Sequence, residues 1–255
     1  MDNKSEIRLA VLIDADNVPY KNIRGVMEEI AIYGTPTFKR IYGDWTKPTV
    51  AGWKKVLLEN ALTPIQQYSY TTGKNSSDSA LIIDAMDILY SGKVDGFCIV
   101  SSDSDFTRLA TRLREAGMKV IGIGQKKTPS PFRVACDKFI YLEIIPLAEE
   151  EHSVVNVEKP AKTKAAKKND TESVPKINRE TLKLIHSTIE DLADETGWAF
   201  LGDVGNLLLK KQPDFDPRLY GFQKLTPLIS SLPQFEIDKR DTDKRGIKHV
   251  YIRNK

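Results

Sequence analysis

Two acidic clusters stand where apolar segments of the sequence end. The first segment, LAVLIDADN, covers residues 9–17, and the second, GFCIVSSDSDF, covers residues 96–106. Each apolar run predicts a buried strand, and Asp14 and Asp103 lie where these strands stop. In an open parallel sheet, the carboxyl ends of the strands form the edge at which ligands bind. Several carboxylates at one edge repel one another unless a cation joins them, so the pattern indicates a hard divalent metal.

A third acid, Asp78, precedes a helical segment between these two clusters. The apolar stripe of that segment consists of Leu81, Ile82, Ala85, Ile88 and Leu89. Asp78 lies on this stripe, one turn before its first member, because positions three and four residues apart share a helix face. A carboxylate directed toward a sheet is costly unless it is paired or bound to a metal. We therefore expect Asp78 at the same edge as Asp14 and Asp103.

Single acids in these segments also have ordinary structural explanations. Asp103 or Asp105 alone would be a helix N-cap, and Asp44, which follows IYG, could belong to a turn. Asp84 and Asp87 fall off the apolar stripe and are assigned to the solvated face of the helix. Three acidic sites that converge on one edge nevertheless favour a metal site.

The composition is typical of a globular protein. With 255 residues, 40% apolar and 29% charged, the chain can form one large domain or two ordinary ones. It lacks the run of roughly eighteen apolar residues that a membrane helix needs, and its first residues, MDNKSEIRLA, are too charged for a signal peptide. We therefore expect a cytoplasmic protein without membrane contact. A net charge of +3 does not by itself imply a nucleic-acid partner.

Other catalytic chemistry is poorly represented in the sequence. Cys98 and Cys136 form no metal or redox motif and are interpreted as core residues. The histidines, His152, His186 and His249, lie away from the predicted strand ends, which argues against histidine-based catalysis. Phosphoryl transfer by a carboxylate-held metal fits the inventory best.

Strand-like and helical segments alternate from residue 8 to residue 143. This alternation predicts an α/β fold in which helices cover both faces of a parallel sheet. Residues 149–175 include KPAKTKAAKKNDTESVP and predict a flexible charged linker, whose lysines could also contact RNA phosphates. Residues 176–255 show three helical segments and a two-stranded ribbon, a winged-helix plan. The predicted domains are residues 1–148 and 176–255.

The three acidic motifs, VLIDADN, KNSSDSALIIDAMD and IVSSDSDF, resemble in order and spacing those of the NYN domain family, a branch of the PIN-like ribonucleases. The resemblance covers about residues 7–145. It implies a PIN-like Rossmannoid α/β/α sandwich and a divalent-metal-dependent ribonuclease activity. It also implies that Asp14, Asp78, Asp103 and Asp105 hold the metal and that Asn17 is the polar partner beside the first acid.

These residues suggest a mechanism for RNA hydrolysis. One or two Mg²⁺ or Mn²⁺ ions held by the four aspartates would orient and deprotonate a water, bind the scissile phosphate and neutralise the leaving oxygen. Asn17 could orient the water or a phosphate oxygen. Lys74, Arg108 and Arg112 are candidates for neutralising flanking phosphates, with solvated surface charges as the alternative.

The segment RLYGFQKLTPLISSLP, followed by FEI and a basic wing, resembles the LOTUS or OST-HTH domain over about residues 176–255. The resemblance implies a winged-helix module that binds RNA or, in some members, a helicase. Phe222, Leu225, Leu228 and Ile229 form a core stripe, so the aromatic signature is interpreted as packing rather than base stacking. RNA binding would then fall to basic residues near the third helix and in the wing, namely Lys224, Lys239, Arg240, Lys244, Arg245 and Lys248.

Two other classes of function stay open. The pattern Asp14-x-Asp16-x-Val18 fits the nucleophile motif of the haloacid dehalogenase-type phosphatases, although the SSDSDF cluster and the lack of an evident cap insertion fit that family poorly. A non-catalytic RNA-binding or scaffold protein would retain the fold and turn nothing over. Acids at all four predicted metal positions argue against this second class.

Overall fold

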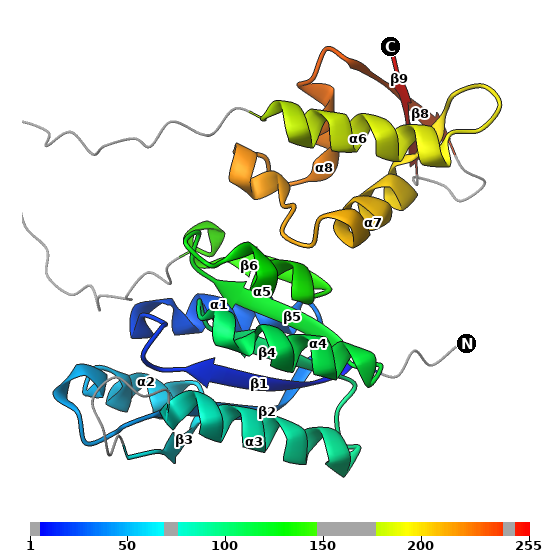
Figure 1. Ribbon diagram of the computed structural model, residues 1–255. Coiled ribbons are helices and arrows are strands. Elements are labelled where there is room, and N and C mark those ends of the chain that lie inside the picture. The colour runs from blue at the N-terminus through cyan, green and yellow to red at the C-terminus, as the bar shows by residue number, and fades with distance from the viewer. Residues whose placement is uncertain (1–5, 69–75, 147–176, 242–247) are drawn as a thin grey trace, which may run out of the picture.

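The computed structural model describes residues 6–68, 76–146, 177–241 and 248–255 (Figure 1). The N-terminal domain is built on six parallel strands in the order β3-β2-β1-β4-β5-β6. The strands are β1 (Arg8–Asp14), β2 (Thr35–Gly43), β3 (Thr63–Gln66), β4 (Gly96–Val100), β5 (Lys119–Gly124) and β6 (Lys138–Tyr141). The strand order reverses between β1 and β4, so the ends of these two strands flank the switch point of the sheet.

Helices cover both faces of this sheet, which confirms the α/β/α sandwich (Figure 1). One face carries α1 (Ile23–Ala31) and α2 (Trp53–Glu59), and the other carries α3 (Ser76–Ser91), α4 (Thr107–Glu115) and α5 (Ser130–Ala135). Because side chains alternate along a strand, Leu9 and Val11 of β1 pack toward α1, whereas Ala10 and Leu12 pack toward α3 and α4. Both faces of β1 are therefore buried.

Helix α3 presents the predicted apolar stripe to the sheet, with Leu81 and Ala85 fully buried. The assignment of Asp84 to the solvated face is wrong. Its carboxylate forms an ion pair with Arg40 and accepts a hydrogen bond from the Tyr42 hydroxyl, both from β2. Long side chains of a neighbouring strand can reach a helix position beside the stripe, and the pattern of the helix alone does not show this. Asp87 is exposed, as predicted.

The C-terminal domain contains the three predicted helices and the predicted ribbon. The helices are α6 (Arg179–Leu192), α7 (Leu201–Lys211) and α8 (Leu225–Ser230), and β8 (Phe235–Asp241) pairs with β9 (Lys248–Asn254). A short strand, β7 (Ala199–Phe200), adds a third strand beside β9 that the sequence did not predict. Leu228 and Ile229 of the predicted core stripe are buried, and Phe222 and Leu225 pack against the same core.

The two domains contact each other along β6, the edge strand of the large sheet (Figure 1). The Phe139 backbone N–H, on the free edge of β6, donates a hydrogen bond of 2.9 Å to the carbonyl oxygen of Pro213. Leu219, in the 3₁₀ turn η5 (Pro217–Tyr220), packs against the core of the N-terminal domain. The segment of residues 213–219 thus covers part of a sheet edge that would otherwise be open to another strand.

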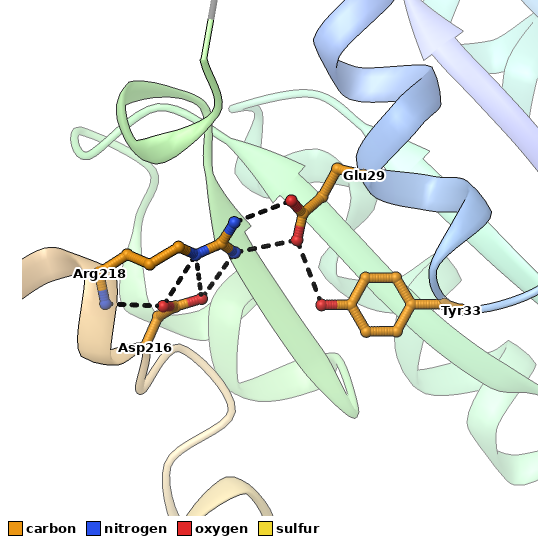
Figure 2. Close-up of polar contacts among 4 residues, drawn as sticks. All are labelled: Glu29, Tyr33, Asp216 and Arg218. Carbon is orange, nitrogen blue, oxygen red and sulfur yellow. Dashed lines mark hydrogen bonds and ion pairs between the residues drawn. The ribbon is translucent and has the colours of Figure 1, made fainter. Parts of the chain in front are cut away.

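Two ion-pair clusters reinforce this contact. In the first, Arg218 lies between Glu29 of α1 and Asp216, and the Tyr33 hydroxyl donates to Glu29 (Figure 2). The distances from the Arg218 guanidinium to Glu29 are 2.8 and 2.9 Å, and those to Asp216 are 2.8 to 3.2 Å. The side chains of Glu29 and Asp216 are each only 6% exposed. This arrangement is named the Arg218 cluster below.

The second cluster joins Arg133 of α5 and Tyr141 of β6 to Asp214. The Tyr141 hydroxyl donates to Asp214 at 2.6 Å and accepts from the Arg133 guanidinium at 2.6 Å. Arg133 also forms an ion pair with Asp214. Tyr141 is the last residue of β6, whereas the Arg218 cluster lies near Lys138, its first residue. The C-terminal domain is consequently held near both ends of the edge strand.

The remaining predictions about architecture concern cysteines, membrane segments and the linker. Cys98 and Cys136 are buried and free, as predicted. Within the described part of the chain, no helix is long and apolar enough to cross a membrane. The predicted linker, residues 149–175, lies outside the described residues.

Candidate metal centre

Strand β1 ends on a buried carboxylate. Asp14 is 1% exposed, and both of its oxygens accept hydrogen bonds. Oδ2 accepts from the Asn17 side-chain amide at 2.6 Å and from the Ser101 hydroxyl at 2.8 Å, and Oδ1 accepts from the Asp16 backbone N–H at 3.1 Å. Burial raises the pKa of Asp14, and the hydrogen bonds from Asn17 and Ser101 oppose that rise by stabilising the carboxylate.

The segment after β4 brings two further acids to the same edge. The Asp103 carboxylate caps the 3₁₀ turn η3 (Ser104–Phe106) by accepting the Asp105 backbone N–H at 2.9 Å. Asp103 is therefore an N-cap, as the alternative explanation predicted, and this hydrogen bond involves only one of its two carboxylate oxygens. Asp105 is exposed and Asp103 partly buried. A capping role and a role in metal binding are thus compatible in this residue.

Three carboxylates converge at this edge. One oxygen from each of Asp78, Asp103 and Asp105 lies within 4.8 Å of the other two. Asp78 stands in the first turn of α3, which places it where the sequence predicts. Asp14 lies near this group without belonging to it, and its charge acts on Asp78. We name the three converging residues the acidic triad.

The carboxylates of this edge repel one another, and Asp78 shows the effect. Burial is the largest cause that raises the pKa of Asp78 to about 7, and the charges of Asp14, Asp103, Asp105 and Asp16 raise it further. Hard divalent cations prefer carboxylate oxygens, and a cation here would relieve the repulsion. The donor set therefore fits Mg²⁺ or Mn²⁺.

Ser101 is a residue of this edge that sequence reasoning missed. Its fully buried hydroxyl donates to Asp14 and accepts the Asp103 backbone N–H at 3.1 Å, so it links the ends of β1 and β4. The sequence feature that could have identified Ser101 is its position between an apolar strand and the acids of IVSSDSDF. Asp44, which the sequence left unresolved, belongs to a turn, because its carboxylate accepts from Thr46 and from the Gln66 side chain.

A cavity of about 320 Å³ opens beside Asp16 and Asn17. Its other walls include Tyr20, from the 3₁₀ turn η1 (Tyr20–Asn22), and Gln125 and Lys127, which follow β5. Sequence reasoning missed these three residues, because nothing in their own segments predicts that they meet the end of β1. A concave surface therefore lies next to the end of β1.

The predicted RNA contacts that the structure describes lie on α4 and in the C-terminal domain. Arg108 and Arg112 are exposed on α4, which follows the triad, and Arg112 donates to the Tyr90 hydroxyl at 3.2 Å. In the C-terminal domain, Lys224, Lys239 and Lys248 are exposed, whereas Arg240 forms an ion pair with Asp238 and stacks on Tyr251. Lys74, Lys244 and Arg245 lie outside the described residues.

The sequence matches two known families. The NYN domain family matches over residues 8–143, and the OST-HTH/LOTUS domain family over residues 172–247. These matches agree with a six-stranded parallel sheet flanked by helices and with a C-terminal helical domain. The chain belongs to the NYN domain family and carries an OST-HTH/LOTUS domain. A comparison of the sequence with curated proteins gives no match.

Three solved structures are similar to parts of the chain. A protein of unknown function from Vibrio parahaemolyticus is 20% identical, with a TM-score of 0.46, and the match covers 55% of this chain and 96% of that protein. An uncharacterized protein from Nitrosomonas europaea is 31% identical, with coverage of 40% and 92% and a TM-score of 0.29. A protein from Chromobacterium violaceum is 30% identical, with coverage of 30% and 82% and a TM-score of 0.25. Because these TM-scores are low, the family assignment rests on the sequence matches.

Proposed function

We propose that this protein is a divalent-metal-dependent ribonuclease that hydrolyses RNA phosphodiesters. The observation that carries the proposal is the acidic triad at the carboxyl edge of the sheet, in a chain of the NYN family. NYN domains belong to the PIN-like nucleases, and carboxylate-held metals are the usual catalysts of phosphodiester hydrolysis. The OST-HTH/LOTUS domain supports RNA as the substrate.

The residues of the edge have separable roles in this proposal. Asp78, Asp103 and Asp105 hold Mg²⁺ or Mn²⁺, and Asp14 adds negative charge from its buried position. A bound ion would supply Lewis acidity toward the phosphate and lower the pKa of a coordinated water. The Asn17 amide donates to Asp14, and this contact supports a positioning role for Asn17 in the proposal. Arg108, exposed in the first turn of α4, attracts the flanking phosphates, whereas Arg112 contacts Tyr90 in the last turn of α3, away from Asp78.

The geometry of Asp14 argues against a phosphatase of the haloacid dehalogenase type. Such an enzyme needs an accessible aspartate nucleophile, but Asp14 is 1% exposed and its oxygens accept three hydrogen bonds.

A non-catalytic RNA-binding protein would not need to gather three repelling carboxylates, which cost stability unless a cation joins them. A helicase partner and a cytoplasmic location stay predictions.

The test uses the full chain with labelled single-stranded and structured RNAs in Mn²⁺, Mg²⁺ or EDTA. We expect cleavage with at least one of the two metals and none in EDTA. Asp103→Asn should abolish cleavage, because it removes a metal ligand at the exposed edge. Asp87→Asn, on the solvated face of α3, is the matched control and should cleave like the wild type. Cleavage that persists in EDTA, or in Asp103→Asn at saturating Mn²⁺, would contradict the proposal.

A further inference from the structure

The cavity beside the end of β1 has walls that suit a flat ring with polar edges. Its volume, about 320 Å³, lies at the lower end of the range for small-ligand sites. Buried apolar side chains line one part of it, amides and single charges line another, and the Tyr20 ring adds an aromatic wall. The apolar residues are Val18, Val50 and Trp53, and the polar ones are Asp16, Asn17, Gln125 and Lys127. We name this space the Tyr20 cavity.

A glycine holds the Tyr20 ring in place. A Cβ on Gly52 would stand 2.6 Å from Cε1 of this ring, 2.8 Å from Cδ1 and 3.0 Å from Cζ, so the ring packs directly on the Gly52 backbone. The backbone angles of Gly52, φ −62° and ψ −22°, are ordinary helical values that do not require glycine. The glycine therefore makes room for the ring. Tyr20 remains 38% exposed, so part of its side chain is open to a ligand.

The Tyr20 cavity borders the acidic edge. Asp16 lines the cavity, and its charge acts on Asp78 of the triad. Gln125, another wall residue, donates its backbone N–H to the Ser102 hydroxyl at 2.9 Å, and Ser102 directly precedes Asp103. The cavity walls are thus tied to the segments that carry the acids, and a ligand in the cavity would lie beside them.

The charges of the cavity walls favour a neutral ring over a phosphate. Among the lining residues that the structure describes, only Asp16 and Lys127 are charged, and their signs are opposite. Asp16 and the nearby triad would repel a phosphate, whereas they would not repel a neutral heterocycle. The side-chain amides of Asn17 and Gln125 can exchange hydrogen bonds with the edge of such a ring, and Tyr20 can stack on its face. Nucleobases combine a flat face with a polar edge in this way.

We propose that the Tyr20 cavity binds one unpaired nucleobase next to the scissile phosphate, with its face on Tyr20 and its edge toward Asn17 and Gln125. The inference rests on the proposed ribonuclease function and deepens it, because it makes Tyr20 a residue that selects the cleavage site. A base in a duplex has its edge paired and both faces stacked, so it must leave the duplex to enter the cavity. Tyr20 therefore restricts cleavage to single-stranded segments, loops and bulges.

The first test removes the ring and the base, separately and together. The full wild-type chain is incubated with a short end-labelled single-stranded RNA and Mn²⁺ to map a cleavage site, and matched RNAs then carry one abasic nucleotide on either side of that site. Tyr20→Ala, or the abasic nucleotide on one of the two sides, should lower kcat/KM about tenfold, a size typical of one base–aromatic stack. The two changes together should cost little more than either alone, because both remove the same contact.

Three further variants separate the ring from the fold. Tyr20→Phe keeps the ring and should restore the response to the abasic nucleotide. Gly52→Leu places a side chain where the ring lies, and it should show the same loss and the same insensitivity to the abasic nucleotide as Tyr20→Ala. The matched control is Tyr90→Ala, which removes a ring that is 74% exposed near the end of α3 and should keep the wild-type response. Melting curves of all variants should coincide with that of the wild type.

Binding measured in EDTA separates this inference from the nuclease proposal, because cleavage plays no part in it. The probes are the same RNA labelled with fluorescein and its duplex with a complementary strand, and the readout is fluorescence anisotropy. Tyr20→Ala should weaken binding of the single strand about tenfold and leave binding of the duplex unchanged. Loss of single-strand affinity in Tyr20→Ala, with no cleavage by the wild type in Mn²⁺ or Mg²⁺, would support the base site and refute the nuclease.

Several results would overturn the proposal. A loss in Tyr20→Ala that is equally large on intact and abasic RNA would give Tyr20 a structural role only. Metal-dependent cleavage and RNA binding at wild-type levels in both Tyr20→Ala and Gly52→Leu would remove the cavity from base recognition while leaving the nuclease intact. Equal affinity of the wild type for a free nucleoside monophosphate and for the RNA strand, both lost in Tyr20→Ala, would make the cavity a small-molecule site.

Discussion

Replacing Arg218 by methionine tests whether the Arg218 cluster holds the two domains together. The change removes the guanidinium but keeps an apolar stem of similar length, so Glu29 and Asp216 would face each other as buried, unpaired carboxylates. Breaking a buried ion pair by removing one partner typically costs about 3–5 kcal/mol. Arg218 is 22% exposed, so we expect the lower end, about 3 kcal/mol of unfolding free energy.

The assay is urea denaturation of the full chain, followed by intrinsic fluorescence. The matched control is Arg24→Met, which removes an exposed ion pair with Glu28 from α1 and should cost less than about 1 kcal/mol. In a double-mutant cycle, Arg218→Met and Glu29→Gln should show a coupling energy of about 2 kcal/mol, because the second change removes a charge that the first left unpaired. A loss in Arg218→Met no larger than in Arg24→Met, with coupling below about 0.5 kcal/mol, would refute the reasoning.

The remaining predictions concern the acidic edge and the domain contact. Mn²⁺ or Mg²⁺ should raise the melting temperature of the full chain, because a metal at 100 times its dissociation constant stabilises the folded state by about 2.7 kcal/mol. Asp78→Ala should abolish this shift. Coincident melting curves of the wild type with and without metal would count against an assembled site. In metal-free buffer, Asp103→Asn should melt no lower than the wild type, since it relieves repulsion within the triad, and a clear drop would assign Asp103 a mainly capping role. A chain ending at residue 146 should melt at a lower temperature than the full chain, because it leaves the edge of β6 uncovered, and it should cleave short RNAs only if it stays folded. An unchanged melting temperature would contradict a stabilising role of the domain contact.

The sheet and its acidic edge could be predicted because their signals are local in the sequence. Both faces of β1 and β4 are buried, so these strands appear as continuous apolar runs that stop at Asp14 and before Asp103. Their ends flank one switch point only if β4 pairs with β1 on the side opposite β2, and the sheet has this order. The apolar stripe of α3 places Asp78 toward the same edge without any knowledge of the neighbouring strands.

The partners of single polar residues could not be predicted in the same way. Asp84 has an ordinary exposed position in the helical pattern, yet Arg40 and Tyr42 reach it from β2. Ser101 resembles any serine after a strand, and only the pairing of β1 with β4 brings it to Asp14. Such contacts join residues far apart in the chain, and helix or strand periodicity describes only one side of each contact.

The contact between the domains shows the same limit on a larger scale. The segment QPDFDPRL is rich in proline and aspartate and resembles an ordinary loop between helices. In the structure its acids and its arginine meet Arg133, Tyr141 and Glu29 of the other domain. The sequence of a charged loop does not indicate that its ion-pair partners lie in another domain of the same chain. A tethered, independent C-terminal module was therefore the natural expectation from the sequence.

Docking near both ends of β6 bears on how the proposed ribonuclease would bind RNA. A module on a flexible linker raises the local concentration of substrate but leaves its direction free. A module held at Tyr141 and beside Lys138 cannot rotate about a single contact, so the C-terminal domain keeps a fixed orientation toward the sheet. Tyr141 ends β6 at the same carboxyl edge at which Asp14 ends β1, because the strands are parallel. Under the proposed ribonuclease function, RNA held by the C-terminal domain would therefore approach the acidic edge in one orientation, and the Arg218 cluster would influence where RNA is cut as well as how stable the chain is.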